Sequence, residues 1–149
     1  MTFRALFLAT AVMAARASHA DSGDTVAKWL LYEPARIEWR AAENLPPGAQ
    51  VAVLEGDPAK EGFFTMRLKL PAGARLDPHT HPADERVTVL SGSVHIGFGD
   101  TFDLSKGRTF AAGAFYITPT PMPHFVWTDE GAILQVTGLG PWGLRYLAR

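Results

Sequence analysis

The residues of this chain best suited to chemistry are two closely spaced histidines, His79 and His81, followed by a carboxylate at Glu85. Residues i and i+2 of a β-strand point to the same side, so both imidazoles can approach one ion from a single rigid element. Pro82 lacks a backbone donor and favours a turn, after which Glu85 can face back from the next strand. A third imidazole is available at His124, just before an apolar stretch.

This donor set predicts a site for one divalent transition metal ion. Imidazole is a borderline ligand, so three histidines and a carboxylate suit Fe, Mn, Cu, Ni or Zn better than Mg or Ca. Four protein ligands leave one or two positions of a five- or six-coordinate ion for water, substrate or dioxygen. A His-x-His pair alone is also compatible with ordinary hydrogen-bonded histidines on a strand. The chain contains no cysteine, which excludes disulfides and thiolate ligands.

The elements that must position these side chains are short β-strands. The chain of 149 residues has 47% apolar residues, enough for a core, and its 14 Gly and 11 Pro supply many turns. The clearest strand is 63–70, where the even-numbered positions are apolar and share one face. We expect further strands at 36–40, 50–54, 86–90, 93–98, 109–112, 114–118, 125–128, 133–137 and 144–147. Ser91-Gly92 predicts a hairpin between two of them, and no amphipathic helix of three turns is evident.

The first 20 residues have the layout of a cleavable secretory signal. Arg4 precedes an apolar run, and the small residues Ser18 and Ala20 precede a cut before Asp21. The run is shorter than the roughly 20 residues that span a bilayer, so we expect export to the periplasm or the exterior and no membrane span. An N-terminal core helix is the alternative. The expected division is a signal peptide at 1–20, an N-terminal arm at 21–35 and one barrel domain at 36–149.

A longer pattern of residues resembles the cupin superfamily. The first cupin motif is matched in full by Gly73, His79, His81, Glu85 and Gly92 with their spacing. The second motif is resembled by Gly113, Pro119 and His124, with Pro121 and Thr128 at positions where the family usually has Gly and often has Asn. The match spans about residues 60–137. It implies an all-β fold, namely a single cupin-type β-barrel of antiparallel strands, similar to a jelly roll and of the monocupin, cupin-2 type.

The resemblance also implies roles for individual residues. The residues that match the usual metal ligands of the family are His79, His81, Glu85 and His124. Glu85 is in addition the candidate catalytic residue, because it could leave the metal and act as a base. Single-barrel cupins commonly pair as dimers, so the early strands could form a homodimer.

A pocket beside the metal is expected to be apolar and aromatic. The expected lining residues are Phe64, Met66, His95, Phe115, Met122 and Trp127, of which alternation lets only about half face inward. His95 alternates with Val94 and Ile96 and points away from their side, as an ordinary hydrogen-bonded histidine would. The alternative is that it lies behind the metal ligands or faces the substrate. Such a pocket favours a small molecule that is partly apolar or planar.

Three functions are compatible with these features. The first is a metal-dependent enzyme acting on a small molecule, with a dioxygenase ahead of a lyase, isomerase or decarboxylase. The second is a module that binds or senses a small molecule or a metal without turnover, and the third is a structural barrel with an empty site. The complete ligand set argues against the third. A net charge of −1 and the absence of any basic run argue against a nucleic-acid partner.

Overall fold

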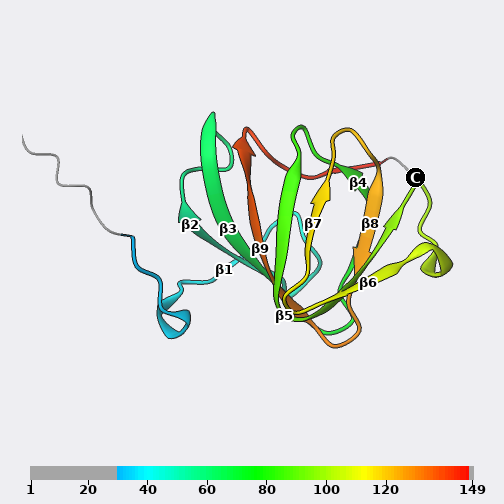
Figure 1. Cartoon of the computed structure of the whole chain (residues 1–149), viewed down its shortest axis with the longest axis horizontal. Coiled ribbons are helices and arrows are strands. Elements are labelled where there is room, and N and C mark those ends of the chain that lie inside the picture. The colour runs from blue at the N-terminus through cyan, green and yellow to red at the C-terminus, as the bar shows by residue number, and fades with distance from the viewer. Residues whose placement is uncertain (1–29, 148–149) are drawn as a thin grey trace, which may run out of the picture.

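The computed structural model describes residues 30–147, which fold into one curled sheet of ten strands (Figure 1). All strand pairs are antiparallel. The described residues contain two 3-10 turns, η1 at Pro34–Arg36 and η2 at Leu104–Lys106. None of the described helices is long and apolar enough to cross a membrane. The predicted signal peptide 1–20 and residues 21–29 of the predicted arm lie outside the described residues.

The sheet curls so that its two halves face each other and share strand β5. The first half-sheet contains β1 (Arg40–Ala41), β2 (Gln50–Glu55), β3 (Gly62–Leu70), β9 (Ala132–Gly140), the beginning of β5 (Glu85–Phe98) and β7 (Phe115–Thr118). The second half-sheet contains β10 (Arg145–Tyr146), β4 (Arg75–Thr80), β8 (His124–Trp127), the end of β5 and β6 (Arg108–Ala111). The all-β, antiparallel architecture predicted from the sequence is confirmed.

Strand β5 corrects the predicted hairpin at Ser91-Gly92. The residues on either side of this dipeptide do not pair with each other, because β5 runs through it from one half-sheet to the other. Gly92 has a φ of 70°, and a Cβ there would lie 2.0 Å from the carbonyl oxygen of Gly131. A bend inside a strand and a hairpin turn both require such a glycine, so the sequence signal was the same for both.

Other strand boundaries also differ from the predictions. The predicted strand 36–40 is reduced to β1 at Arg40–Ala41, and β4 was missing from the predicted strands although His79 was expected on one. Strand β9 continues to Gly140, beyond the predicted end at residue 137. Gly140 lies against backbone there, since a Cβ would meet the Lys60 carbonyl oxygen at 2.0 Å. Strand pairing therefore overrides the local preference of glycine for turns.

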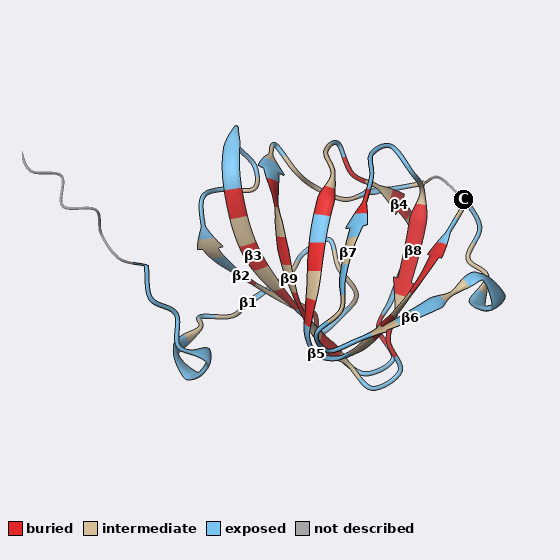
Figure 2. Ribbon diagram, viewed as in Figure 1, coloured by how far each residue is buried: buried red, intermediate tan, exposed pale blue. Residues whose placement is uncertain are grey.

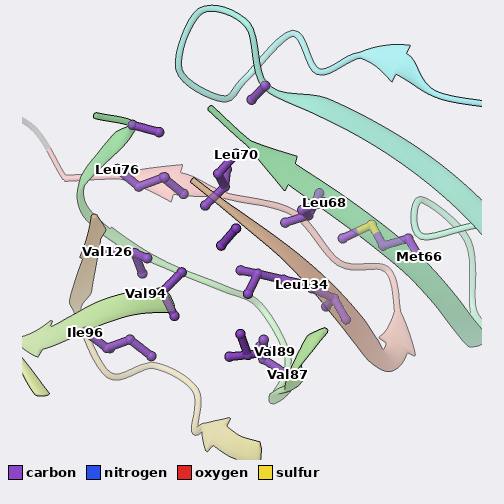
Figure 3. Close-up of a cluster of buried hydrophobic side chains, with 14 of the residues drawn as sticks. Met66, Leu68, Leu70, Leu76, Val87, Val89, Val94, Ile96, Val126 and Leu134 are labelled. Carbon is purple, nitrogen blue, oxygen red and sulfur yellow. The ribbon is translucent and has the colours of Figure 1, made fainter. Parts of the chain in front are cut away.

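The hydrophobic core fills the space between the two half-sheets. Buried and more exposed residues alternate along β3, as expected for a strand with one face inside (Figure 2). Figure 3 shows Leu68 and Leu134 of the first half-sheet pointing into the same interior as Val94 and Val126 of the second. This packing fixes β4, β5 and β8 relative to one another, and the predicted metal ligands lie in these strands or, for His81, directly after β4.

A second packed region lies on the outer face of the second half-sheet. Phe125 and Trp127 alternate with the inward residues of β8, and Phe102 covers them at ring distances of 4.8 and 5.5 Å. Glycines make room for these rings, since a Cβ at Gly97 would lie 2.2 Å from the Phe125 ring and one at Gly107 would lie 2.0 Å from the Trp127 ring. We call Phe102, Phe125 and Trp127 the outer aromatic cluster.

Candidate metal centre

Three histidines converge at one end of the barrel interior. His79 lies in β4, His81 directly follows this strand, and His124 begins β8 opposite His79. The ring centroid of His79 is 4.2 Å from that of His124 and 5.1 Å from that of His81. All three residues are buried, and each offers a nitrogen within 4.8 Å of the others. Such a group can hold a metal ion, so the structure brings together the three histidines selected from the sequence.

Backbone carbonyls set the orientation of all three rings. In each histidine, Nδ1 bonds to a carbonyl oxygen: Asp77 for His79 at 2.7 Å, Gly143 for His81 at 2.9 Å and Met122 for His124 at 3.2 Å. A carbonyl only accepts, so Nδ1 carries the hydrogen and the Nε2 of each neutral ring keeps its lone pair. The Nε2 of His81 is buried without a hydrogen-bond partner. This is the arrangement in which histidine binds a metal through Nε2.

The electrostatics of the site keep the imidazoles neutral. Burial, and then the adjacent His124, lowers the pKa of His79 from 6.5 to about 3. Burial also lowers the pKa of His124 to about 4 and lowers that of His81. Three charged imidazoles could not share this space, whereas three neutral ones can donate lone pairs to one cation. The donor chemistry therefore fits a transition metal.

Glu85 lies beside the histidines at the start of β5. Its Oε2 is 3.5 Å from the Nε2 of His81, and the residue is buried. Burial raises the pKa of this carboxyl from 4.5 to about 8. A cation bound to the histidines would favour the ionised form instead. Glu85 is thus within reach of the site but lies outside the group of three mutually close histidine nitrogens.

The histidines and Glu85 line a cavity of only about 20 Å³, which is room for roughly one water molecule. The segment that follows β9 closes it on one side. Trp142 stacks on the ring of His81 at 4.8 Å, and Leu144 is part of the lining. Strand β10 then pairs with β4, with Tyr146 opposite His79. The C-terminal segment therefore both covers the site and supplies the Gly143 carbonyl that orients His81.

The predicted pocket residues do not all face this cavity. Phe64 and Met66 are buried in the barrel core but are not among the lining residues. Phe115 is 59% exposed and Met122 is 44% exposed, and neither lines the cavity, so these two candidates belong to the half that does not face inward. In β7 the inward neighbour of Phe115 is Tyr116, which lines the cavity. Hydrophobicity could not reveal this, because the more apolar residue of the two faces outward.

His95 and Trp127 lie on the outer face of the second half-sheet, away from the cavity. Their rings stack at 4.8 Å. The Nε2 of His95 bonds to Asp129 at 3.1 Å, and its Nδ1 bonds to the Thr109 hydroxyl at 2.9 Å. Both nitrogens are therefore occupied. His95 is thus placed as an ordinary hydrogen-bonded histidine, and it is not among the residues that line the cavity.

Comparison with known proteins agrees with this geometry. Residues 27–142 match a family described as the ChrR cupin-like domain. Germin-like protein 3-1 of Oryza sativa subsp. japonica is 37% identical over 73 residues, which is 48% of this chain and 32% of that protein. The chain thus matches about a third of this relative's length.

Two solved structures show the same fold at low sequence identity. The polyketide cyclase RemF from Streptomyces resistomycificus superposes with a TM-score of 0.69 at 14% identity, over 82% of this chain and 87% of that one. The structure of Rhodobacter sphaeroides SigE in complex with the anti-sigma ChrR gives a TM-score of 0.54 at 18% identity, over 71% and 50%. At these identities the likeness concerns the fold alone.

Proposed function

This chain belongs to the ChrR cupin-like family, and on that premise we propose that it is a metal-dependent enzyme acting on a small molecule inside its barrel. The resemblance of its motifs to the cupin superfamily is confirmed by the family match. The observation that best supports a metal site is the convergence of three neutral imidazoles whose Nδ1 atoms are all engaged by carbonyls. We assign His79, His81 and His124 as ligands of one Fe, Mn, Cu, Ni or Zn ion.

The roles of the chain's own groups follow from their positions. Glu85 completes the ligand set or, when it leaves it, accepts a proton from the substrate. The apolar walls, which include Leu68, Leu134 and Val136, would exclude water from the site. A bound ion would supply Lewis-acid chemistry toward an oxygen-bearing substrate and, if it is iron or copper, redox chemistry with dioxygen. We favour a dioxygenase over a lyase, isomerase or decarboxylase.

A binding or sensing module is the second candidate. The observation that favours it is the small cavity of about 20 Å³, closed by the segment that carries Trp142 and Leu144. A barrel that only captures a metal or a very small ligand needs no larger space. Turnover separates the two candidates: a catalyst forms product, whereas a binding module shows only stabilisation by its ligand.

Metal analysis tests the ligand assignment. Protein purified from its native compartment should contain close to one transition metal ion per chain. His79→Ala and His124→Ala should lose most of it, whereas His95→Ala should retain it, because both nitrogens of His95 are already hydrogen-bonded. Equal metal retention in all three variants would contradict the assignment. A substrate screen with and without oxygen on the metal-loaded protein then distinguishes an oxygenase from a lyase or isomerase.

Export and pairing are proposed from the sequence. Cleavage after Ala20 would leave a mature chain that begins at Asp21, which the intact mass of exported protein measures directly. An uncleaved chain retained in the cytoplasm would contradict it. A homodimer through the early strands β1 and β2 would double the mass measured by light scattering, and a monomeric mass would contradict it.

A further inference from the structure

The cavity beside the histidines has few polar lining residues. Apart from the three histidines and Glu85, the lining is apolar except for one residue, Tyr116. The apolar lining residues are Leu68, Leu70, Leu76, Val87, Val126, Leu134, Val136 and Leu144. A ligand in this space therefore meets the polar groups of these five residues and otherwise only aliphatic side chains.

The pairing of β7 with β5 places Tyr116 on the same face of the sheet as Glu85. Strand β7 runs antiparallel to β5, with Thr118 opposite Glu85 and Tyr116 opposite Val87. Alternation turns Phe115 outward, so Tyr116 and Thr118 share the inner face with Glu85. The ring of Tyr116 packs against Phe110 at 5.0 Å, which restrains it from the side. Tyr116 is thus held by β5 and β6 beside the carboxylate of the site.

The hydroxyl of Tyr116 differs from those of the other two tyrosines. Tyr146 donates to the carbonyl of Asn44 at 3.1 Å, and Tyr32 donates to the carbonyl of Leu54. Among the described residues the Tyr116 hydroxyl has no hydrogen-bond partner. The Thr118 hydroxyl is buried and has none either. In the part of the chain that the structure describes, the fully buried side-chain atoms without a partner are His81 Nε2, Thr118 Oγ1 and Trp142 Nε1. The Tyr116 hydroxyl is not one of these, but Tyr116 lines the cavity, where a ligand can supply a partner for its hydroxyl.

We propose that Tyr116 is a ligand-binding residue whose hydroxyl donates a hydrogen bond to the anion or carbonyl oxygen that occupies the cavity beside the three histidines. The inference rests on the proposed function, since the ligand sits next to the metal ligands. It narrows the ligand class to a small molecule that carries an anionic or carbonyl oxygen, because the cavity of about 20 Å³ has room for that oxygen. A tyrosine phenol is protonated at neutral pH and is therefore available as a donor.

The test compares Tyr116→Phe with Tyr146→Phe in cobalt-loaded protein, using azide as the probe anion. Tyr146 is the matched control because its ring lies 5.8 Å from that of His79 while its hydroxyl is already bonded to Asn44. Azide binding is followed by the visible absorption of cobalt. We expect Tyr116→Phe to bind azide about tenfold more weakly, as the loss of one hydrogen bond to a charged group predicts. Tyr146→Phe should match the wild type.

The outcomes separate this inference from the proposed function. Unchanged azide affinity in Tyr116→Phe, at normal cobalt content, would overturn the role of the hydroxyl and leave the metal site standing. Loss of cobalt or a lower unfolding midpoint in Tyr116→Phe would also overturn it, because the hydroxyl would then serve the fold. A wild-type protein that binds no cobalt would overturn both proposals. Phe110→Leu, which keeps the hydroxyl, should weaken azide binding less than Tyr116→Phe does.

Discussion

The barrel interior and the outer face of the second half-sheet both place histidine beside aromatic rings, but they leave the ring nitrogens in opposite states. Inside, His81 stacks on Trp142 and hydrogen-bonds through Nδ1 alone, so its Nε2 has no hydrogen-bond partner and its nearest polar neighbour is the Glu85 carboxyl at 3.5 Å. Outside, His95 stacks on Trp127 and bonds through both nitrogens. A buried histidine can therefore bind a metal only where its second nitrogen has been left without a protein partner.

One strand supplies both regions. In β8, His124 and Val126 face the interior, whereas Phe125 and Trp127 face the outer aromatic cluster. Alternation thus places a metal ligand and a packing residue next to each other in the sequence. The inner region is expected to determine metal binding, and the outer region is expected to determine stability.

The largest effect should come from the outer region. Phe125→Ala removes a fully buried ring that packs on Phe102, and we expect the free energy of unfolding to fall by about 3–5 kcal/mol. Urea unfolding measures this loss. Phe115→Ala is the matched control, because Phe115 is 59% exposed. Its replacement should lower the free energy of unfolding by less than about 1 kcal/mol. Equal losses in both variants would show that the outer aromatic cluster does not stabilise the fold.

A smaller effect is expected from the charge of the inner region. Burial raises the pKa of Glu85 to about 8 in the metal-free protein, so the folded state keeps a proton that the unfolded state has released. This group therefore favours folding at low pH, and its contribution is lost as the pH rises through about 8. Glu85→Gln removes this titrating group. The free energy of unfolding of the wild type minus that of the variant should therefore fall by about 2 kcal/mol from pH 6 to pH 8.

The same urea titrations at both pH values check this prediction in metal-free protein. Both proteins retain His79 and His124, so the titration of these imidazoles cancels in the comparison. The wild type should be relatively more stable at pH 6. A difference between the two proteins that does not vary with pH would mean that Glu85 is ionised in the folded state already.

The smallest effect is expected at the surface partner of His95. The Asp129 side chain is 80% exposed, and it bonds at the surface to the Nε2 of His95, whose side chain is 20% exposed. Asp129→Asn should change the free energy of unfolding by less than about 0.5 kcal/mol and should leave metal content unchanged. A large loss of metal in this variant would link His95 to the metal site. It would thereby contradict the view that only the inner region determines metal binding.

The sequence predicted the inner region better than the outer one. His79 and His81 could be placed together because the i, i+2 spacing within a strand is a local rule, and motif spacing then linked them to His124. The all-β class followed from short strands and frequent turns. These inferences needed only periodicity and residue type, which a single sequence contains.

The remaining features depend on strand pairing, which the sequence does not contain. Whether Phe115 or Tyr116 faces the cavity depends on the register between β7 and β5. A glycine at position 92 is typical both of a hairpin turn and of a bend inside a strand. Only the pairing of β5 with both half-sheets decides between these two structures. The Gly143 carbonyl that orients His81 lies 62 residues further along the chain, so no local pattern could predict that bond.

The most direct test is a crystal structure of the zinc-loaded protein with anomalous scattering recorded at the zinc edge. The account predicts one zinc ion bound by the Nε2 atoms of His79, His81 and His124, at about 2.0–2.1 Å from each nitrogen. The Nδ1 atoms should keep their carbonyl partners. Zinc bound instead beside His95, or bound at the three histidines through Nδ1 with those carbonyl bonds broken, would contradict it.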